Sequence, residues 1–360
     1  MDGTGGGAVI DAGPPCSGAS VPPLACRVLQ LQAAGLPGQS WLATNEDGFL
    51  AAWAETSAQR RVELRGIALD GGTFLSVIYP TSEIAEGVSA SGAGKQWALV
   101  WNTGADTPVS CVSSMSPTQV ELDGGNTGYR RAVVAISDAG AIGIAAPEYF
   151  SQQMGVAESA QGCPTAFTAR YWNSANNALG VSASFRPGDG VFVYTRSGSN
   201  PLNGTGDVHI FQGDGGYKTY LLTEQLYDSV GAISDDGNFV QIVAALPDGG
   251  LTLRSVRSDL SQSIAAVGIH LAANVQWWNN ASCGPDCFSI IYVDRLGGGI
   301  ERLRAHLTDV GSAPRPGSPR DVLCSVPSGS TAGIAWYQGK LGVLVARATG
   351  GVELRICEMP

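Results

Sequence analysis

The chain has 360 residues, of which 49 are glycine and 19 are proline, and only 14% are charged, about half the usual share. Each glycine weakens a helix interior by roughly 1 kcal/mol, so this composition disfavours a helical fold and favours strands joined by tight turns. An apolar content of 44% supports a buried core. Because the net charge of −10 repels phosphate backbones, no nucleic acid partner is expected.

The first 25 residues are expected to form a flexible Gly/Pro/Ser tether. They lack the positively charged start and the apolar core of a signal peptide. Such a stretch is typical of the segment after the lipid-bearing cysteine of a bacterial lipoprotein, with Met1 replacing what was removed. A disordered N-terminus of no consequence is the alternative. No apolar run reaches the 18 or more residues of a membrane helix, so no transmembrane segment is expected.

Seven short apolar runs recur along the rest of the chain. Their first residues are separated by 45 to 53 residues, and seven such units account for most of the sequence. The runs occupy residues 49–55, 97–103, 142–148, 191–196, 239–245, 288–294 and 341–347. Because both faces of these runs are apolar, we expect them to be central, buried strands.

Further strands are predicted around each apolar run. A segment of small residues ending in a tight turn precedes it, as in SDAG at 137–140 and SDDG at 234–237. Half-exposed strands with alternating polarity follow at 61–69, 108–115, 154–160, 207–213, 251–257, 300–307 and 352–358. Weaker fourth strands follow at 73–79, 118–122, 166–172, 218–224, 262–267 and 320–326. Four antiparallel strands at this period are typical of a β-propeller blade.

The seventh unit lacks a fourth strand, because the sequence ends at Pro360 directly after its third strand. The N-terminal strand CRVLQLQ, at residues 26–32, would fill this place and remove an open edge. The sequence therefore predicts an all-β fold, a seven-bladed β-propeller with four antiparallel strands per blade. It forms one domain over residues 26–360, closed by an N-terminal strand that completes the last blade. An open solenoid is the competing arrangement. An open array has no reason to lack a strand at one end, so the missing fourth strand favours the closed ring.

The turns NEDG, SDAG and SDDG before apolar strands resemble the S-x-D-G hairpins of TolB-type and WD-like propeller repeats. The pattern FLAAWAE followed by VELRGIALDGG is similar to repeats of extracytoplasmic bacterial propellers. This resemblance covers roughly residues 26–360, and it implies an architecture and not an activity. The Trp-Asp and Gly-His pairs of true WD repeats are absent from the sequence, which counts against a cytosolic WD scaffold.

Eight widely scattered cysteines and only three histidines favour disulfide bonds over zinc, and so an oxidising compartment. Cys283 and Cys287 flank a Gly-Pro-Asp turn and are expected to pair with each other, with half of a metal site as the alternative. For the others the favoured pairs are Cys26 with Cys357, Cys111 with Cys163, and Cys16 with Cys324. Pairs of Cys16 with Cys26 and Cys324 with Cys357 stay open as the local alternative. We expect no cofactor and no metal ion.

The exits of the apolar strands are expected to surround one mouth of the propeller, where ligands commonly bind. Alignment of the runs places charges at five exits, which are Glu55, Glu148, Arg196, Asp294 and Arg347. Nearby loops add the aromatic residues Tyr129, Tyr149 and Trp172, and interface centres favour aromatics with arginine. The longest inserted loop is expected at 196–206. Alternatively, the charges mark where strands meet water and the aromatics cover blade edges.

Two functions fit these features. The favoured one is a noncatalytic, extracytoplasmic binding module, a monomer in the periplasm or at the cell surface whose loop face binds a protein or a glycan of the envelope. The alternative is a glycan-active hydrolase or lyase with carboxylates from different blades. The sequence contains no Gly-x-Ser-x-Gly elbow, no H-E-x-x-H helix and no phosphate-binding loop. A hydrolase requires carboxylates within catalytic reach in a deep pocket, whereas a binder requires a broad face.

Overall fold

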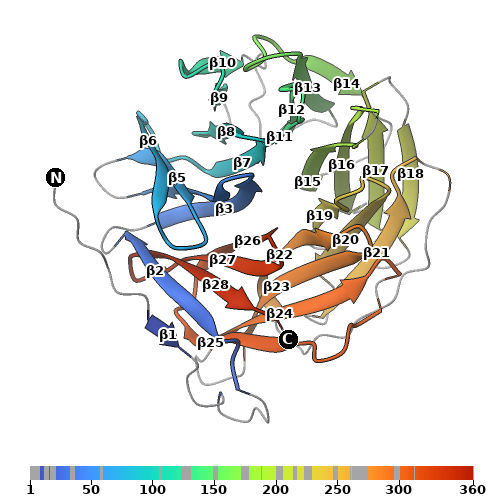
Figure 1. The fold of residues 1–360 in the computed structure, drawn as a ribbon. Helices are drawn as coiled ribbons and strands as arrows, with labels where there is room; N and C mark the ends of the chain where they lie inside the picture. The colour runs from blue at the N-terminus through green and yellow to red at the C-terminus, as the bar shows by residue number, and fades with distance from the viewer. Residues whose placement is uncertain are drawn as a thin grey trace.

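The computed structural model places seven sheets in a closed ring (Figure 1). It describes residues 9–11, 16, 22–32, 37–56, 60–104, 108–122, 131–148, 153–171, 178–187, 189–199, 206–213, 217–222, 229–245, 250–259, 261, 275–295, 301–311 and 313–359. Every regular element in these ranges is a strand. Within them, no helix with the length and apolarity of a membrane span is found.

The first four blades follow one another along the chain, each an antiparallel sheet in sequence order. Blade 1 contains β3 (Pro37–Asn45), β4 (Gly48–Glu55), β5 (Arg61–Ile67) and β6 (Thr73–Pro80). Blade 2 contains β7 (Gly87–Ala93), β8 (Gln96–Asn102), β9 (Val109–Ser113) and β10 (Val120–Leu122). Blade 3 contains β11 (Val133–Ile136), β12 (Ile142–Pro147), β13 (Gln153–Ser159) and β14 (Thr168–Tyr171). Blade 4 contains β15 (Ala178–Phe185), β16 (Phe192–Ser199), β17 (Gly206–Gln212) and β18 (Tyr217–Leu222).

The last three blades complete the ring. Blade 5 contains β19 (Ser229–Ile233), β20 (Phe239–Ala245) and β21 (Leu251–Arg257), and its expected fourth strand at 262–267 lies outside the described residues. Blade 6 contains β22 (Val275–Gly284), β23 (Cys287–Arg295), β24 (Glu301–Asp309) and β25 (Arg320–Val326). Blade 7 contains β26 (Thr331–Tyr337), β27 (Lys340–Ala346), β28 (Val352–Glu358) and β2 (Cys26–Gln32), with β1 (Val9–Asp11) beside β2. The predicted seven-bladed propeller is confirmed.

The predicted apolar runs form the second strand of each blade. Every residue of β4 and of β12 is buried, as expected for strands that are covered on both faces. The predicted turns SDAG and SDDG join first and second strands, and they end at Gly140 and Gly237 with φ of 85° and 70°. Residues other than glycine rarely adopt these angles, so the turn sequence fixes where each hairpin folds back.

Hydrophobic cores lie between neighbouring blades. The ring of Phe49 in β4 lies against Gly342 of β27, where any larger residue would collide with it. Nearer the axis, Gly333 of β26 approaches β3 so closely that a Cβ would lie 2.6 Å from the backbone nitrogen of Leu42. The inner strands can meet around a narrow channel because small residues occupy such contacts.

The N-terminal strand closes the ring, as predicted. β2 pairs with β28, and the two strands lie side by side in blue and red in Figure 1. Cys26 lies opposite Cys357, and the two residues form a disulfide with their Cα atoms 4.0 Å apart. The third strand of blade 7 therefore has no open edge.

Described parts of the segment 1–25 are attached to the last two blades, which differs from the expected tether. β1 adds a strand beside β2, and Cys16 forms a disulfide with Cys324 of β25. Leu24 is buried in the core between blades 6 and 7, and its N–H donates to the carbonyl of Asp321 at 2.8 Å. These parts belong to the folded domain, because apolar burial and a covalent bond hold them in place.

The remaining cysteines also form the favoured pairs. Cys111 of blade 2 is bonded to Cys163 of blade 3, and Cys283 is bonded to Cys287 within the first hairpin of blade 6. Four disulfides point to an oxidising, extracytoplasmic environment.

Replacing Cys26 and Cys357 by alanine is expected to destabilise the propeller more than replacing Cys283 and Cys287. With Cys16–Cys324 intact, the Cys26–Cys357 bond closes a loop of roughly 43 residues, and the Cys283–Cys287 bond closes one of about five. The corresponding losses of chain entropy in the unfolded state stabilise the fold by about 4 and about 2 kcal/mol. Urea unfolding of the two double variants measures both losses. Equal losses would contradict a major role of ring closure in stability.

Candidate functional site

Four of the predicted site residues lie at the same mouth of the ring. Glu55 ends β4, Glu148 directly follows β12, Asp294 is next to last in β23, and Arg347 directly follows β27. These positions are the corresponding ends of the second strands in blades 1, 3, 6 and 7, so closure of the ring gathers them at one side. We call these four residues and their ion-pair partners the rim.

The rim carboxylates are buried. Glu55 and Glu148 are each 5% exposed, and Asp294 is 2% exposed. A buried carboxylate needs a cation or hydrogen-bond donors to offset its lost hydration. The sequence interpretation that charges mark where strands meet water is therefore wrong for these three acids.

In blade 1, two carboxylates hold two arginines. Arg61 Nε lies 2.8 Å from Glu55 Oε2, and Arg61 Nη2 lies 2.7 Å from Glu63 Oε1. Arg65 Nη2 lies 3.1 Å from Glu63 Oε2, and its guanidinium lies 5.3 Å from the ring centre of Trp53. All five side chains come from adjacent strands β4 and β5, whose antiparallel register places Trp53 opposite Glu63. The arginines are fixed from two sides.

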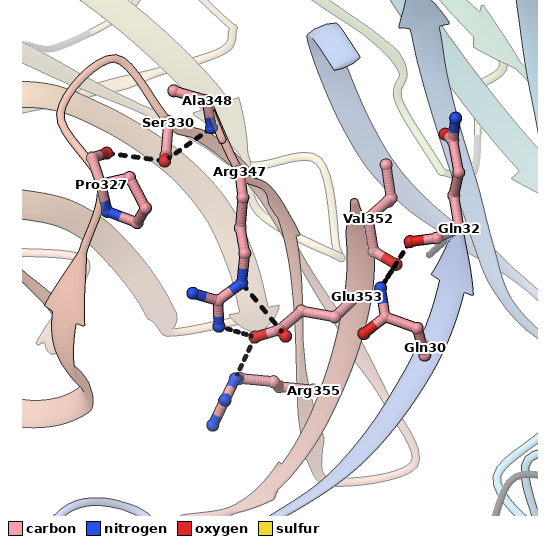
Figure 2. A network of polar contacts seen from close by, with 9 residues as sticks. All are labelled: Gln30, Gln32, Pro327, Ser330, Arg347, Ala348, Val352, Glu353 and Arg355. Carbon is pink, nitrogen blue, oxygen red and sulfur yellow. Dashed lines mark hydrogen bonds and ion pairs between the residues drawn. The ribbon is translucent and has the colours of Figure 1, made fainter. Parts of the chain in front are cut away.

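Blade 7 repeats this arrangement with one carboxylate (Figure 2). Glu353 Oε1 accepts hydrogen bonds from Arg347 Nη2 at 3.0 Å and from Arg355 Nε at 2.7 Å. The Arg355 side chain is buried, whereas that of Arg347 is 28% exposed. On the other side of β28, Gln30 of the closing strand donates to the carbonyl of Val352 at 3.0 Å. The buried acid thus fixes an arginine that reaches solvent.

In blade 6, Arg304 lies between two aspartates. Its Nη1 is 3.7 Å from Asp294 Oδ2, and its Nε is 3.0 Å from Asp321 Oδ1. Arg302 Nη1 lies 3.6 Å from Asp321 Oδ2. Burial raises the pKa of Asp294, and the positive charges of Arg304 and Arg302 oppose this effect. Such a shift is expected of a buried ion-pair network as well as of a catalytic acid.

These three networks share one design. In each network, a buried carboxylate forms an ion pair with one part of an arginine side chain. That arginine is partly exposed, and the exposed fraction of the side chain is 27% for Arg61 and 22% for Arg304. A guanidinium that is fixed and partly exposed in this way suits carboxylate, sulfate or phosphate groups. The arrangement can hold an anionic group, whereas its own carboxylates are committed to arginines.

The other predicted site residues are not brought into the rim. Arg196 lies inside β16, opposite Val181 and His209, and not at a strand exit. The loop expected at 196–206 is shorter in the structure. β16 continues to Ser199 and β17 begins at Gly206, so strand residues occupy both ends of the expected loop. Tyr129, Tyr149 and Trp172 lie outside the described residues.

Two acids of these networks were not predicted, although the sequence carries a signal for them. Glu63 and Glu353 both belong to the tetrapeptide Val-Glu-Leu-Arg, which occurs at 62–65 and again at 352–355. Alternate residues of a strand point to one face, so each Glu and the Arg two residues later lie side by side. The recurrence of this pair in the third strands of two blades predicts a shared ion pair.

His306 is a titratable group without a hydrogen-bond partner. It lies on β24, is 2% exposed, and neither ring nitrogen makes a hydrogen bond. Burial, together with the charge of Arg304, lowers the pKa of His306 to about 4. Burial also raises the pKa of Tyr292, the residue that pairs with Arg304, to about 12. His306 is therefore neutral at pH 7, and its uncharged form is part of the core.

No candidate metal centre is found in the part of the chain that the structure describes, where no three His, Cys, Asp or Glu residues cluster. In the LDGG turn at 69–72, Asp70 Oδ1 accepts the N–H of Gly72 at 2.8 Å. This carboxylate therefore serves the turn.

The sequence matches no protein family model and no curated protein. Its structure is similar to the BP39L lectin from Burkholderia pseudomallei, with a TM-score of 0.60, 14% identity, and coverage of 88% of this chain and 95% of that one. A chain of the mitotic checkpoint complex is similar at a TM-score of 0.56, 12% identity, and coverage of 92% and 91%. KlHsv2 with loop 6CD replaced by a Gly-Ser linker has a TM-score of 0.50, 11% identity, and coverage of 86% and 90%. These likenesses show the propeller fold.

Replacing Glu353 by glutamine is expected to destabilise the protein by about 3 kcal/mol, because it leaves the buried Arg355 without its carboxylate. Replacing the more exposed partner, Arg347, by alanine should cost about 1 kcal/mol or less. Urea unfolding of the two variants gives both values. A loss for Glu353→Gln no larger than that for Arg347→Ala would show that the carboxylate does not hold Arg355.

Replacing His306 by leucine is expected to reduce the loss of stability in acid. The folded-state pKa of about 4 lies below the ordinary 6.5, so between these values the unfolded chain binds the proton and stability falls as pH falls. Between pH 7 and pH 5, His306 therefore lowers the free energy of unfolding by about 2 kcal/mol. Urea unfolding of both proteins at the two pH values measures the difference, and an unchanged pH dependence in His306→Leu would refute it.

Proposed function

We propose that this chain is a noncatalytic, extracytoplasmic binding module that recognises a protein or a glycan at the rim. The observation that carries the proposal is the set of fixed arginines. Arg61 and Arg347 are each held by a buried acid and are partly exposed at the same mouth of a rigid ring. Preorganised donors lose little conformational entropy on binding, which favours recognition of anionic groups.

The kind of partner follows from the charge of the rim. Guanidinium groups recognise carboxylates and sulfates, so we propose an acidic glycan or an acidic segment of an envelope protein as the partner. A propeller named as a lectin is a precedent for glycan recognition on this fold. We further propose, on the basis of the SDAG and SDDG turns, that the blades are of the TolB-type or WD-like kind. The Gly/Pro/Ser composition of residues 1–25 supports the proposal that this segment follows a lipid-bearing cysteine.

A glycan-active hydrolase or lyase is the second candidate, favoured by the raised pKa of Asp294 and by a second carboxylate, Asp321, on the other side of Arg304. Both aspartates are less than 5% exposed, and Arg304 lies between them. A substrate would have to displace this arginine to reach either carboxylate. We therefore favour the binding module.

Binding to an array of neutral, carboxylated and sulfated oligosaccharides, together with cross-linking to an envelope fraction, tests the proposal. The double variant Arg61→Ala/Arg347→Ala is expected to lose about tenfold in affinity for acidic partners at low salt. Arg257→Ala is the matched control, because Arg257 ends the third strand β21 at the mouth opposite the rim. This variant should leave binding unchanged.

Two results would overturn the proposal. Equal binding by the rim variant and the control would exclude the rim as the recognition surface. Turnover of an oligosaccharide that Asp294→Asn abolishes, with a folded variant, would replace the binding module by the hydrolase.

A further inference from the structure

The first strands of the seven blades line an open cavity of about 250 Å³ in the channel. Most of its lining comes from the halves of these strands that lead into the first hairpin turn of a blade, including Trp41 to Thr44 of β3 and Ile334 to Trp336 of β26, whereas β11 contributes its first residues, Val133 and Val134. The cavity therefore belongs to the mouth opposite the rim, which we call the hairpin mouth. Its volume lies slightly below the usual range for drug-sized ligands, so it suits a small group.

Two tryptophans give the cavity aromatic walls. Trp41 packs against the core between blades 1 and 2 and also against the core between blades 3 and 4, so its ring crosses part of the channel. The indole N–H of Trp336 donates to Ser289 Oγ at 2.7 Å, which fixes its ring and uses its only donor. Trp336 thus offers its ring surface and no further hydrogen-bond donor.

Three polar side chains of the lining form hydrogen bonds within the wall of the cavity. The hydroxyl of Ser282 donates to Gly284 O at 3.0 Å, and that of Ser184 donates to Phe185 O at 3.2 Å. The amide of Asn280 donates through Nδ2 to Gln241 O at 3.1 Å. Its Oδ1 accepts no hydrogen bond, although Asn280 is only 7% exposed and lines the cavity. Because this oxygen is itself buried, a ligand in the cavity does not reach it.

The hairpin mouth also carries negative charge. Asp235 lines the cavity from the first turn of blade 5, where its backbone N–H donates to Ser282 Oγ at 3.0 Å and its side chain is exposed. The corresponding turns of blades 1 and 3 carry the exposed residues Asp47 and Asp138. These three carboxylates attract cations toward their side of the mouth and repel anions, whereas the first turn of blade 2 carries Lys95.

We propose that this cavity binds a compact organic cation, namely an alkylammonium or guanidinium group. Its N–H groups would donate to the carboxylate of Asp235, and its charge would lie over the face of Trp41 or Trp336, which line the cavity. A neutral ligand of the same size would lack the attraction to the carboxylate and to the ring faces. The group belongs either to a free diamine or to a Lys or Arg side chain of a partner. This site does not depend on the proposed function, which uses the opposite mouth.

Isothermal titration calorimetry with 1,5-diaminopentane, with the blocked peptide acetyl-Gly-Lys-Gly-amide and with neutral 1,5-pentanediol tests the proposal. We expect at least one of the two cationic probes to bind and the diol not to bind. Stronger binding of the diamine would indicate a free amine, and stronger binding of the peptide would indicate a partner side chain. Binding of the diol as tight as that of the diamine, or no binding of either cation, would overturn the proposal.

Two charge-neutralising variants separate the cavity from the general field of the mouth. Asp235→Asn is expected to weaken the better cationic probe by about fivefold, the upper value for a single partly exposed ion pair. Asp138→Asn removes the same charge from the same turn of another blade without lining the cavity, and it should change binding by less than about twofold. Equal losses in the two variants would refute a specific site.

Discussion

The pairing of β2 with β28 is the interaction on which the rest of the structure depends. Each blade buries its apolar faces only against its neighbours, so no blade has a complete core until the ring is closed. The closing strand supplies a ladder along β28, and it also contacts blade 1, where Arg65 Nη1 donates to the carbonyl of Leu31 at 2.5 Å. Through this contact one strand joins the last blade to the first. The positions of the rim and the channel follow from that closure.

Between the blades, charge and apolar packing are combined on the same third strands. Val62 and Leu64 of β5 are buried toward blade 2, whereas Glu63 and Arg65 lie on the face toward blade 7. A strand with alternating residues can do both because its side chains alternate between faces. The acids are buried for this reason, and the arginines that they hold reach the surface at the mouth. The same geometry that stabilises the ring therefore supplies the groups that we propose for recognition.

The sequence predicted the fold because the signal for a propeller is local and repeats. Apolar runs, Asp-Gly turns and a missing strand are all visible without tertiary structure, and the pairing of Cys26 with Cys357 followed from them. The site was predicted less well. Whether Glu55 or Asp294 is exposed depends on the adjacent blade, which the sequence of one blade does not describe. Arg196 was predicted at a strand exit, although it lies inside β16. The polar residues that follow it suit an irregular loop as well as a continued strand. The channel cavity arises from seven strands far apart in sequence, and no local pattern marks it.

The closing strand is made first and paired last. Cys26 and Cys357 are 331 residues apart, so at a synthesis rate of about 5–20 residues per second the N-terminal strand waits for on the order of tens of seconds before its partner exists. During this interval the nearest thiol to Cys26 is that of Cys16, whose own partner, Cys324, is also still to be made. The order of synthesis thus favours a local Cys16–Cys26 bond that the finished ring cannot contain. A Cys16–Cys26 bond formed in this interval must be broken by thiol–disulfide exchange before the two native bonds can form.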